Sequence, residues 1–230
     1  MDKFTTGLAH DLNNILLPIT TITQVVLDGL QEDTEIWQNL SKVLAAAEQG
    51  RELGEKIKDA GVLKAANFCP VDLKSVVLDT LMSLDAQIPS NVTVKTMFQD
   101  VGNIMGDADQ IKKLLLMLVE NALQAIGEDL GEIEISLVPM AFKNSSDIPG
   151  NKLKPGIFAK LTIQDSGHGM TPAVIEKAFD PYFSTKSSGL GTGLSLAAVY
   201  GIVRGHGGDI AVQTIPDQMA KFDVYFSTLN

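Results

Sequence analysis

Apolar residues at helical spacing dominate the first part of the chain. They recur at alternating intervals of four and three, at Leu8, Leu12, Ile15, Ile19, Ile22 and Val26. This rhythm is typical of the apolar seam of a helix packed in a bundle. After a polar turn over residues 28–33, the same rhythm continues from Ile36 to Gly61. The pattern predicts two antiparallel helices, and since a lone hairpin cannot cover two apolar seams, we expect two chains to pair into a four-helix bundle.

The pattern changes after residue 64. Residues 65–71 include Pro70, which disfavours helix at the residue before it, and are predicted to form a linker. Helical spacing then covers 72–85, 108–127 and 193–204. Strand-like alternation covers 92–98, 133–138, 158–165, 209–214 and 221–226, and the polar stretch 143–155 is predicted to be an exposed loop. Helices and a sheet that each have one apolar face predict a two-layer α/β sandwich, so the fold class is α+β, with a helical hairpin followed by a sandwich.

Composition restricts the kinds of partner and the cellular location that we expect. The chain has 230 residues, of which 45% are hydrophobic, enough to bury a core. A net charge of −10 argues against nucleic acid or an anionic membrane as a general partner. Cys69 is the only cysteine and no apolar run approaches the roughly 20 residues that span a bilayer, so we expect a cytoplasmic chain without a membrane segment, whose full-length parent could be membrane-anchored.

Three motifs point to a nucleotide. A glycine-rich run with Gly189, Gly191 and Gly193 leads into a helical pattern that starts at Leu194, and glycines let backbone amides approach an anion. Taken alone such a run is often only a turn. Upstream, however, residues 165–170 (DSGHGM) end a strand-like run, and Asn121 lies in the helical segment KKLLLMLVENALQAI. Together the three motifs resemble boxes of the GHKL ATP-binding fold: the Asn121 segment the N box, residues 165–170 the G1 box and the glycine-rich run the G2 box. They occur along the chain in the order N, G1, G2, as in that family.

The N-terminal segment narrows the family. Residues 7–19, GLAHDLNNILLPI, resemble the phosphoacceptor H box of sensor histidine kinases, in the form common among nitrogen-regulator-like and hybrid kinases. The resemblance spans nearly the whole chain and implies the core of a two-component histidine kinase. It implies a dimerisation and histidine-phosphotransfer domain over 1–64 and a catalytic ATP-binding domain over 72–230. It also implies ATP and Mg²⁺ as cofactors, a homodimer through residues 1–64, and the receiver domain of a response regulator as partner.

The resemblance assigns three catalytic residues to the first helix. His10 would be the phosphoacceptor, since a neutral imidazole is a nucleophile near neutral pH. Asp11 would polarise the ring or accept its proton. Asn14, one turn after His10, occupies the position at which the family aligns a water for dephosphorylation of the partner. His168 and His206 are interpreted as loop residues rather than phosphoacceptors.

The resemblance also assigns the nucleotide contacts. Asp165 would accept a hydrogen bond from the adenine amino group, and Gly167 and Gly169 would let the backbone fold against the base. Asn121 would coordinate Mg²⁺ through its side-chain oxygen. Lys186 would neutralise the γ-phosphate. The remaining ATP-binding residues of the glycine-rich run are Gly189, Gly191, Thr192, Gly193 and Leu194.

One position departs from the family, and it keeps alternatives open. Met117, one turn before Asn121, stands where the N box usually has a first asparagine, and a thioether is a poor magnesium ligand. The alternative is a dimeric phosphotransfer or scaffold module with weakened or lost ATP turnover. A clamp ATPase of the gyrase or chaperone kind is disfavoured by the His10–Asp11 helix and by the lack of a glutamate one turn before Asn121.

Overall fold

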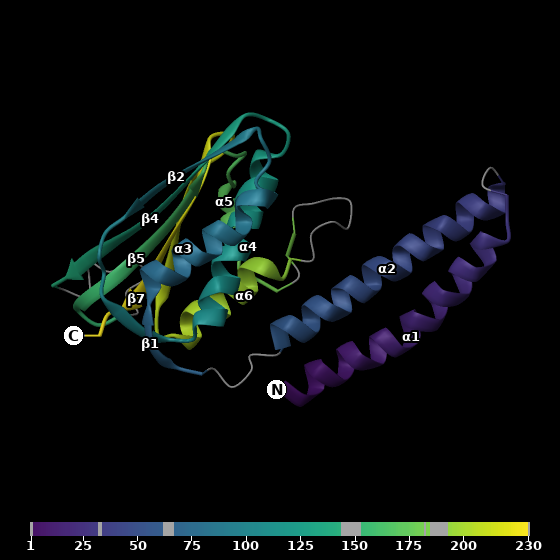
Figure 1. Ribbon diagram of the computed structural model, residues 1–230, viewed down its shortest axis with the longest axis horizontal. Coiled ribbons are helices and arrows are strands. Elements are labelled where there is room, and N and C mark those ends of the chain that lie inside the picture. The colour runs from purple at the N-terminus through teal and green to yellow at the C-terminus, as the bar shows by residue number, and fades with distance from the viewer. Residues whose placement is uncertain are drawn as a thin grey trace. The chain divides into compact units, whose positions relative to one another are not determined.

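The structure, a computed structural model, describes residues 2–31, 34–61, 67–143, 153–181, 183–184 and 193–229. Of residues 2–14, 49, 51–61 and 85 it describes the backbone alone. The described chain forms two compact units, drawn in Figure 1. We call residues 2–61 the hairpin unit, and residues 67–184 with 195–229 the sheet unit.

The hairpin unit consists of two helices, α1 (Asp2–Asp28) and α2 (Glu35–Gly61), which lie side by side (Figure 1). Small side chains line the surface between them. Thr20, Thr23 and Ala47 are buried, and a Cβ added to Gly50 would lie 2.8 Å from Cδ1 of Leu16. The two helices therefore approach closely at a small residue of α2, Gly50.

The predicted apolar seam of α1 does not face α2. Ile15 is 62% exposed, Ile19 39%, Ile22 64% and Val26 44%. The residues that α1 buries, such as Thr20 and Thr23, lie on a different side of the helix. From Ile15 to Val26, the part of the seam whose side chains are described, these residues are exposed in a single chain.

The sheet unit contains a five-stranded sheet in the order β2, β4, β5, β7, β6. The strands are β2 (Val92–Phe98), β4 (Gly131–Phe142), β5 (Gly156–Asp165), β7 (Met219–Ser227) and β6 (Asp209–Ile215). β2 and β4 run parallel, and the other neighbours run antiparallel. Two short strands, β1 (Cys69–Asp72) and β3 (Asn103–Gly106), form a separate antiparallel pair. The sheet is therefore mixed, and its single parallel pair is connected across α4.

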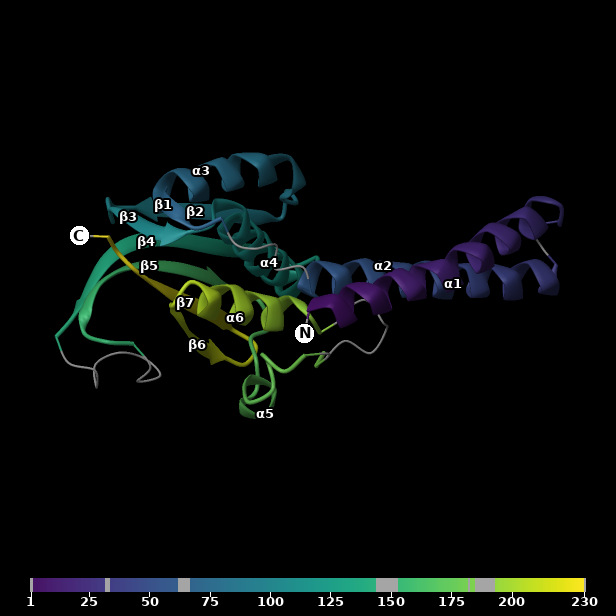
Figure 2. The same ribbon diagram turned by 90° about the horizontal axis from the view of Figure 1, so that it is seen from below.

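Three helices cover one face of this sheet: α3 (Leu73–Leu84), α4 (Ala108–Ile126) and α6 (Ser195–Gly205). Figures 1 and 2 show all three on the same side of the strands. A 3₁₀ turn, η1 (Asp85–Gln87), and a short helix, α5 (Pro172–Ile175), complete the unit. The predicted fold class, an N-terminal helical pair followed by a two-layer α/β sandwich, is confirmed.

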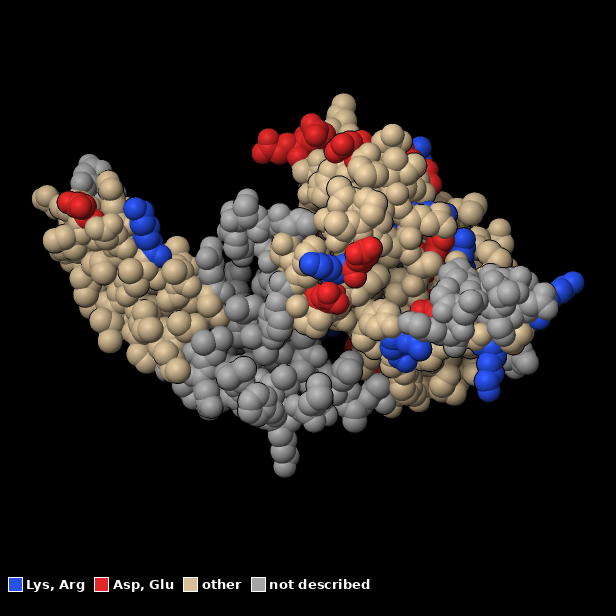
Figure 3. Space-filling model, turned by 180° about the vertical axis from the view of Figure 1, so that it is seen from behind, with Lys and Arg blue, Asp and Glu red and all other residues tan. Residues whose placement is uncertain are grey.

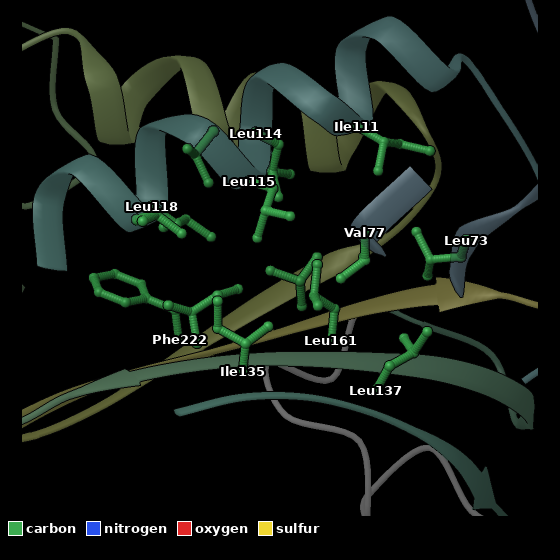
Figure 4. Close-up of a cluster of buried hydrophobic side chains, with 14 of the residues drawn as sticks. Leu73, Val77, Ile111, Leu114, Leu115, Leu118, Ile135, Leu137, Leu161 and Phe222 are labelled. Atoms are coloured by element: carbon green, nitrogen blue, oxygen red, sulfur yellow. The ribbon is translucent and has the colours of Figure 1, made fainter. Parts of the chain in front are cut away.

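The core lies between α4 and the sheet (Figure 4). Leu114, Leu115 and Leu118 of α4 are 0% exposed, because their spacing of one, three and four positions places them on one helix face. The strands meet them with every second residue, such as Ile135 of β4 and Leu161 of β5. Burial of one such side chain stabilises the fold by about 1.5–3 kcal/mol. α4 is therefore firmly placed on the sheet.

Most predicted elements are present, and the differences have a common cause. The helices predicted over 72–85, 108–127 and 193–204 correspond to α3, α4 and α6, and all five predicted strands exist. β1 was expected to lie mostly in a linker, and β3 and α5 were not predicted. Each has only four residues, too few to show a period. Of the predicted loop over 143–155, residues 144–152 lie outside the described residues.

On the face of the sheet opposite the helices, β7 buries the carboxylate of Asp223. Asp223 is 3% exposed and accepts a hydrogen bond from the Thr162 hydroxyl at 2.6 Å. The ammonium groups of Lys160 and Lys221 lie 3.6 and 3.8 Å from its oxygens. Burial and the charge of Asp223 raise the pKa of Tyr225 to about 12. The buried charge is thus balanced within the sheet.

The described surface bears charges of both signs (Figure 3). On the face drawn in Figure 3, acidic and basic side chains of the sheet unit are interspersed, without a continuous basic patch. Across the residues whose structure is described, no helix is long and apolar enough to cross a membrane.

Candidate nucleotide site

Asp165 ends β5 in the protein interior. Its side chain is 4% exposed, and its Oδ1 accepts a hydrogen bond from the backbone N–H of Gly167 at 2.9 Å. Burial raises the pKa of this carboxyl, against the opposing hydrogen bonds from the Gly167 and Ala220 amides. A carboxylate accepts about four hydrogen bonds. Asp165 therefore keeps the capacity to accept a hydrogen bond from a ligand.

Gly167 packs against the backbone of α4. A Cβ at this position would lie 2.6 Å from the carbonyl carbon of Ala125, which no side chain tolerates. The next residue, His168, donates its backbone N–H to the Ala125 oxygen at 3.2 Å. Ala125 lies one helical turn beyond Asn121. The loop after β5 is thus held against the end of the helix that carries Asn121.

Gly169 holds the other side of this loop. Its φ of 59° lies in the left-handed region, and a Cβ there would overlap the carbonyl oxygen of Ile215. The backbone N–H of Met170 donates to Oγ1 of Thr214 at 2.8 Å. The loop is therefore clamped between α4 and the end of β6. Two glycines are required here for different reasons, close packing at Gly167 and backbone conformation at Gly169.

Asn121 presents a buried polar atom that finds no partner. Among the described residues, no hydrogen-bond partner exists for its Nδ2. An unsatisfied buried amide costs about 1–3 kcal/mol, so a ligand that pairs with it would recover this energy. The side-chain oxygen and nitrogen exchange places when the amide turns by half a rotation, and either can face the ligand.

The same residue bears on metal binding. Within the described ranges no group of three or more His, Cys, Asp and Glu side chains could hold a metal ion. Mg²⁺ commonly binds through one or two protein oxygens together with waters and substrate phosphates. The side-chain oxygen of Asn121 is a ligand of this chemical type, and its role as a magnesium ligand stays a prediction.

Met117, one turn before Asn121 on α4, packs against the core. Its side chain is partly buried and packs against the hydrophobic cluster beneath α4. The thioether therefore fills space between helix and sheet.

Only the last part of the glycine-rich run lies within the described residues. Gly193 has a φ of 64°, and after Leu194 the helix α6 begins at Ser195. On the other side of the run, the ring of Phe179 lies 5.5 Å from the ring of Tyr200 on α6. Four predicted site residues lie outside the described ranges: Lys186, Gly189, Gly191 and Thr192.

The residues of the H box lie on α1. The helical backbone places His10 and Asn14 one turn apart, on the same side of the helix. Asp11 follows His10. The side chains of all three lie outside the described part of the structure, and their catalytic roles stay predictions.

Sequence reasoning missed the residues that hold the site together. Ala125 acts through its backbone and Thr214 through a hydroxyl at a strand end, so no local pattern marks either. His206 was interpreted as a loop residue and does lie in the turn after α6, but it is hydrogen-bonded on both ring nitrogens. These contacts join segments that are distant in sequence.

The sheet order, the loop clamped against α4 and the glycine before α6 define a GHKL-type ATP-binding domain. A family model described as histidine kinase-, DNA gyrase B-, and HSP90-like ATPase matches residues 106–229. This is more than half of the chain, and the chain belongs to this family.

The curated relatives include sensor kinases. Sensor histidine kinase ZraS of Klebsiella oxytoca is 29% identical over 221 residues, which cover 95% of this chain and 44% of the relative. ZraS of Salmonella typhi is 31% identical over 235 residues, covering 100% and 46%. Sensor kinase CckA of Brucella abortus is 25% identical over 224 residues, covering 97% and 24%. The chain thus spans less than half the length of each of these relatives.

Solved structures show the same architecture. The catalytic domain of histidine kinase ThkA superposes with a TM-score of 0.57 at 24% identity, covering 70% of this chain and 96% of that one. Full-length ShkA in complex with AMPPNP has a TM-score of 0.68 at 17% identity, covering 100% and 47%. At these identities the likeness is one of fold. With the family match, it confirms the resemblance to a histidine kinase core with a catalytic ATP-binding domain.

Proposed function

We propose that this chain is the catalytic core of a two-component sensor kinase that binds ATP and transfers its γ-phosphoryl group to His10. The observation that carries the proposal is the loop after Asp165, which is held against α4, the helix that carries Asn121. Gly167 and His168 contact Ala125, one turn beyond Asn121, and among the described residues the buried Nδ2 of Asn121 has no hydrogen-bond partner. The names of the relatives support the same function, since they are sensor kinases.

The protein's part in nucleotide binding follows from the chemistry of these residues. Asp165 accepts a hydrogen bond from the adenine amino group, a donor that guanine lacks at that position. Asn121 would supply an oxygen to Mg²⁺, and the metal would neutralise charge on the phosphates. Lys186 adds a positive charge at the γ-phosphate, and the glycines from Gly189 to Gly193 present backbone amides to the phosphates.

The transfer step requires a neutral imidazole at His10. A ring nitrogen attacks the γ-phosphorus, the bond from phosphorus to the β,γ-bridging oxygen breaks, and ADP leaves. The proton on the other ring nitrogen then passes to Asp11 or is stabilised by it. We further propose that the phosphoryl group moves from His10 to an aspartate of a receiver domain, and that Asn14 orients water when the partner is dephosphorylated.

The uncovered seam of α1 supports a homodimer as the working form. Ile15 and Ile22 are each more than 60% exposed in one chain. A second copy would present the same surface, and four helices would bury both seams. Residues 1–64 would then form the dimerisation and phosphotransfer domain, and residues 72–230 the ATP-binding domain.

A labelling experiment tests the main proposal. Purified chain is incubated with γ-labelled ATP and Mg²⁺, and the bound label is treated with acid and with alkali. We expect acid-labile, alkali-stable label, as for a phosphohistidine, and none in a His10→Gln variant that still binds ATP. Label that persists in the variant would show another phosphoacceptor, and a chain that binds ATP without becoming labelled would favour the phosphotransfer or scaffold alternative.

A further inference from the structure

The chain enters the sheet unit at Asn67 and Phe68, which belong to none of the sequence motifs described above. Asn67 donates its backbone N–H to Oδ2 of Asp107 at 2.9 Å. The ring of Phe68 meets the ring of His206 edge to face, with 4.9 Å between the centroids. These first described residues after the hairpin unit are therefore held by two side chains, Asp107 and His206.

Asp107 joins this entry point to α4. It is the N-cap of the helix, and its second carboxylate oxygen, Oδ1, accepts from the N–H of Gln110 at 3.1 Å. Burial alone would raise the pKa of Asp107, but hydrogen bonds from the amides of Gln110, Asn67 and Asp109 outweigh it and the pKa is lowered. One carboxylate thus caps α4 and anchors the incoming chain, with one oxygen for each task.

His206 joins the same point to α6. Its Nε2 accepts from the backbone N–H of Asp107 at 3.0 Å, so its Nδ1 carries the proton and donates to the Ile202 carbonyl at 2.8 Å. Gly106 makes room for the ring, since a Cβ there would lie 2.8 Å from Cδ2 of His206. The ring therefore bridges the start of α4 and the last turn of α6.

Two helices meet at this junction, α4 with its first turn and α6 with its last turn, and both also lie next to the proposed nucleotide site. α4 carries Asn121 and holds the loop of Asp165 through Ala125, while α6 begins directly after Gly193 and Leu194. A helix moves as a rigid element, so a shift at the junction is transmitted along each of them. The site and the chain entry are thus connected by two rigid helices that share one anchor.

We propose that Asp107 and His206 are positioning residues that make nucleotide affinity depend on how the entering chain at Asn67 and Phe68 is held. The proposal rests on the nucleotide site proposed above. The two states are an entering chain bound to Asp107 and one released to water. Coupling is reciprocal, so bound nucleotide strengthens the hold on Asn67 by the factor by which that hold strengthens nucleotide binding.

Asp107→Asn removes the hydrogen bond to Asn67 and keeps the cap of α4. The amide keeps an oxygen that can cap α4 at Gln110, but its NH₂ group cannot accept from Asn67. Asp72 offers a matched control, because it caps α3 through the N–H groups of Lys74 and Ser75, and α3 carries no nucleotide residue. The variants Asp107→Asn and Asp72→Asn therefore make the same chemical change at the caps of two helices in one unit.

The test measures binding of a fluorescent ATP analogue and amide hydrogen exchange at Asn67 in the full 230-residue chain. We expect Asp107→Asn to bind nucleotide about fivefold more weakly, at the low end of typical couplings, and Asp72→Asn to bind as the unaltered chain does. Nucleotide should slow exchange at Asn67 by the same factor in the unaltered chain and not in Asp107→Asn.

Substitutions of His206 separate positioning from simple stability. His206→Gln retains an acceptor for the Asp107 N–H, whereas His206→Leu removes it, so we expect affinity to be kept in the first and lowered in the second. Equal affinity in Asp107→Asn, Asp72→Asn and the unaltered chain would overturn the coupling while leaving the nucleotide site standing. An unaltered chain that binds no nucleotide would overturn both.

Discussion

The two units of this chain bury their apolar residues in opposite ways. In the sheet unit, Leu114, Leu115 and Leu118 of α4 are 0% exposed. In the hairpin unit, Ile15, Ile22 and Val25 of α1 are 62%, 64% and 67% exposed. The sheet unit completes its core within one chain, while α1 of the hairpin unit leaves large apolar side chains exposed among those that are described. The difference shows that only the sheet unit buries a continuous apolar core within its own described residues.

The largest effect should come from a cavity in the sheet unit. Leu118→Ala removes a side chain that is 0% exposed, and we expect it to lower the free energy of unfolding by about 2–5 kcal/mol. Leu130→Ala, at a residue 90% exposed, makes the same change with little effect. Denaturant unfolding at several protein concentrations checks this. Equal losses in the two variants would show that the core does not lie beneath α4.

The next effect concerns assembly and belongs to the hairpin unit. Ile15→Asp places a charge on the exposed seam, and we expect dimerisation to weaken by a factor of about 100 or more, since burying an unpaired charge costs several kcal/mol. Asn39→Asp adds the same charge at an exposed polar position of α2 and should leave the dimer intact. Light scattering over a concentration series measures both. A monomeric mass for the unaltered chain at micromolar concentration would contradict the four-helix bundle.

A third prediction separates function from stability within the sheet unit. Asp165→Asn should weaken adenine binding roughly tenfold or more, since hydrogen bonds to charged groups contribute about 1.5–3 kcal/mol. Titration with ATP measures this affinity. Unchanged affinity would mean that the base binds elsewhere.

The stability of the Asp165→Asn variant relative to the unaltered chain should also change with pH in a definite direction. Because burial raises the folded-state pKa of Asp165 above its unfolded value, its contribution to stability is present at low pH and is lost as pH rises through the folded pKa. Asn carries no such charge. The variant should therefore gain stability relative to the unaltered chain as pH rises across that window, and thermal denaturation at a series of pH values checks it. A constant difference at all pH values would contradict desolvation as the cause.

The smallest effect is expected at Met117. Since its side chain packs against the core, Met117→Asn should destabilise the sheet unit by about 1–3 kcal/mol and leave the Mg²⁺ dependence of phosphorylation unchanged. Thermal denaturation beside a magnesium titration separates packing from metal binding. A stable variant with a higher affinity for Mg²⁺ would instead show that position 117 lies at the metal site.

Much of the fold could be predicted because its elements are long and periodic. α4 shows four turns of apolar spacing, and β4, β5 and β7 alternate for several residues, so both periods stand out from the sequence. β1 and β3 could not be predicted, because four residues are too few to show a period. They pair with each other across more than 30 residues of sequence, Cys69 opposite Gly106, and a local pattern does not contain such a pairing. The seam of α1 was predicted as an interface, but the sequence does not say whether α2 or another chain covers it.

The sequence by itself determined the alternation of helix and strand, the glycines at 167 and 169, and the residue types that nucleotide chemistry needs. Side-chain period and the lack of a Cβ are local properties, so they can be read without a fold. Only the tertiary structure decided that Gly167 lies against Ala125, that Met117 packs against the core, and that Asp107 contacts both Asn67 and His206. These contacts join segments up to 99 residues apart, and their energies depend on distances that local pattern does not contain.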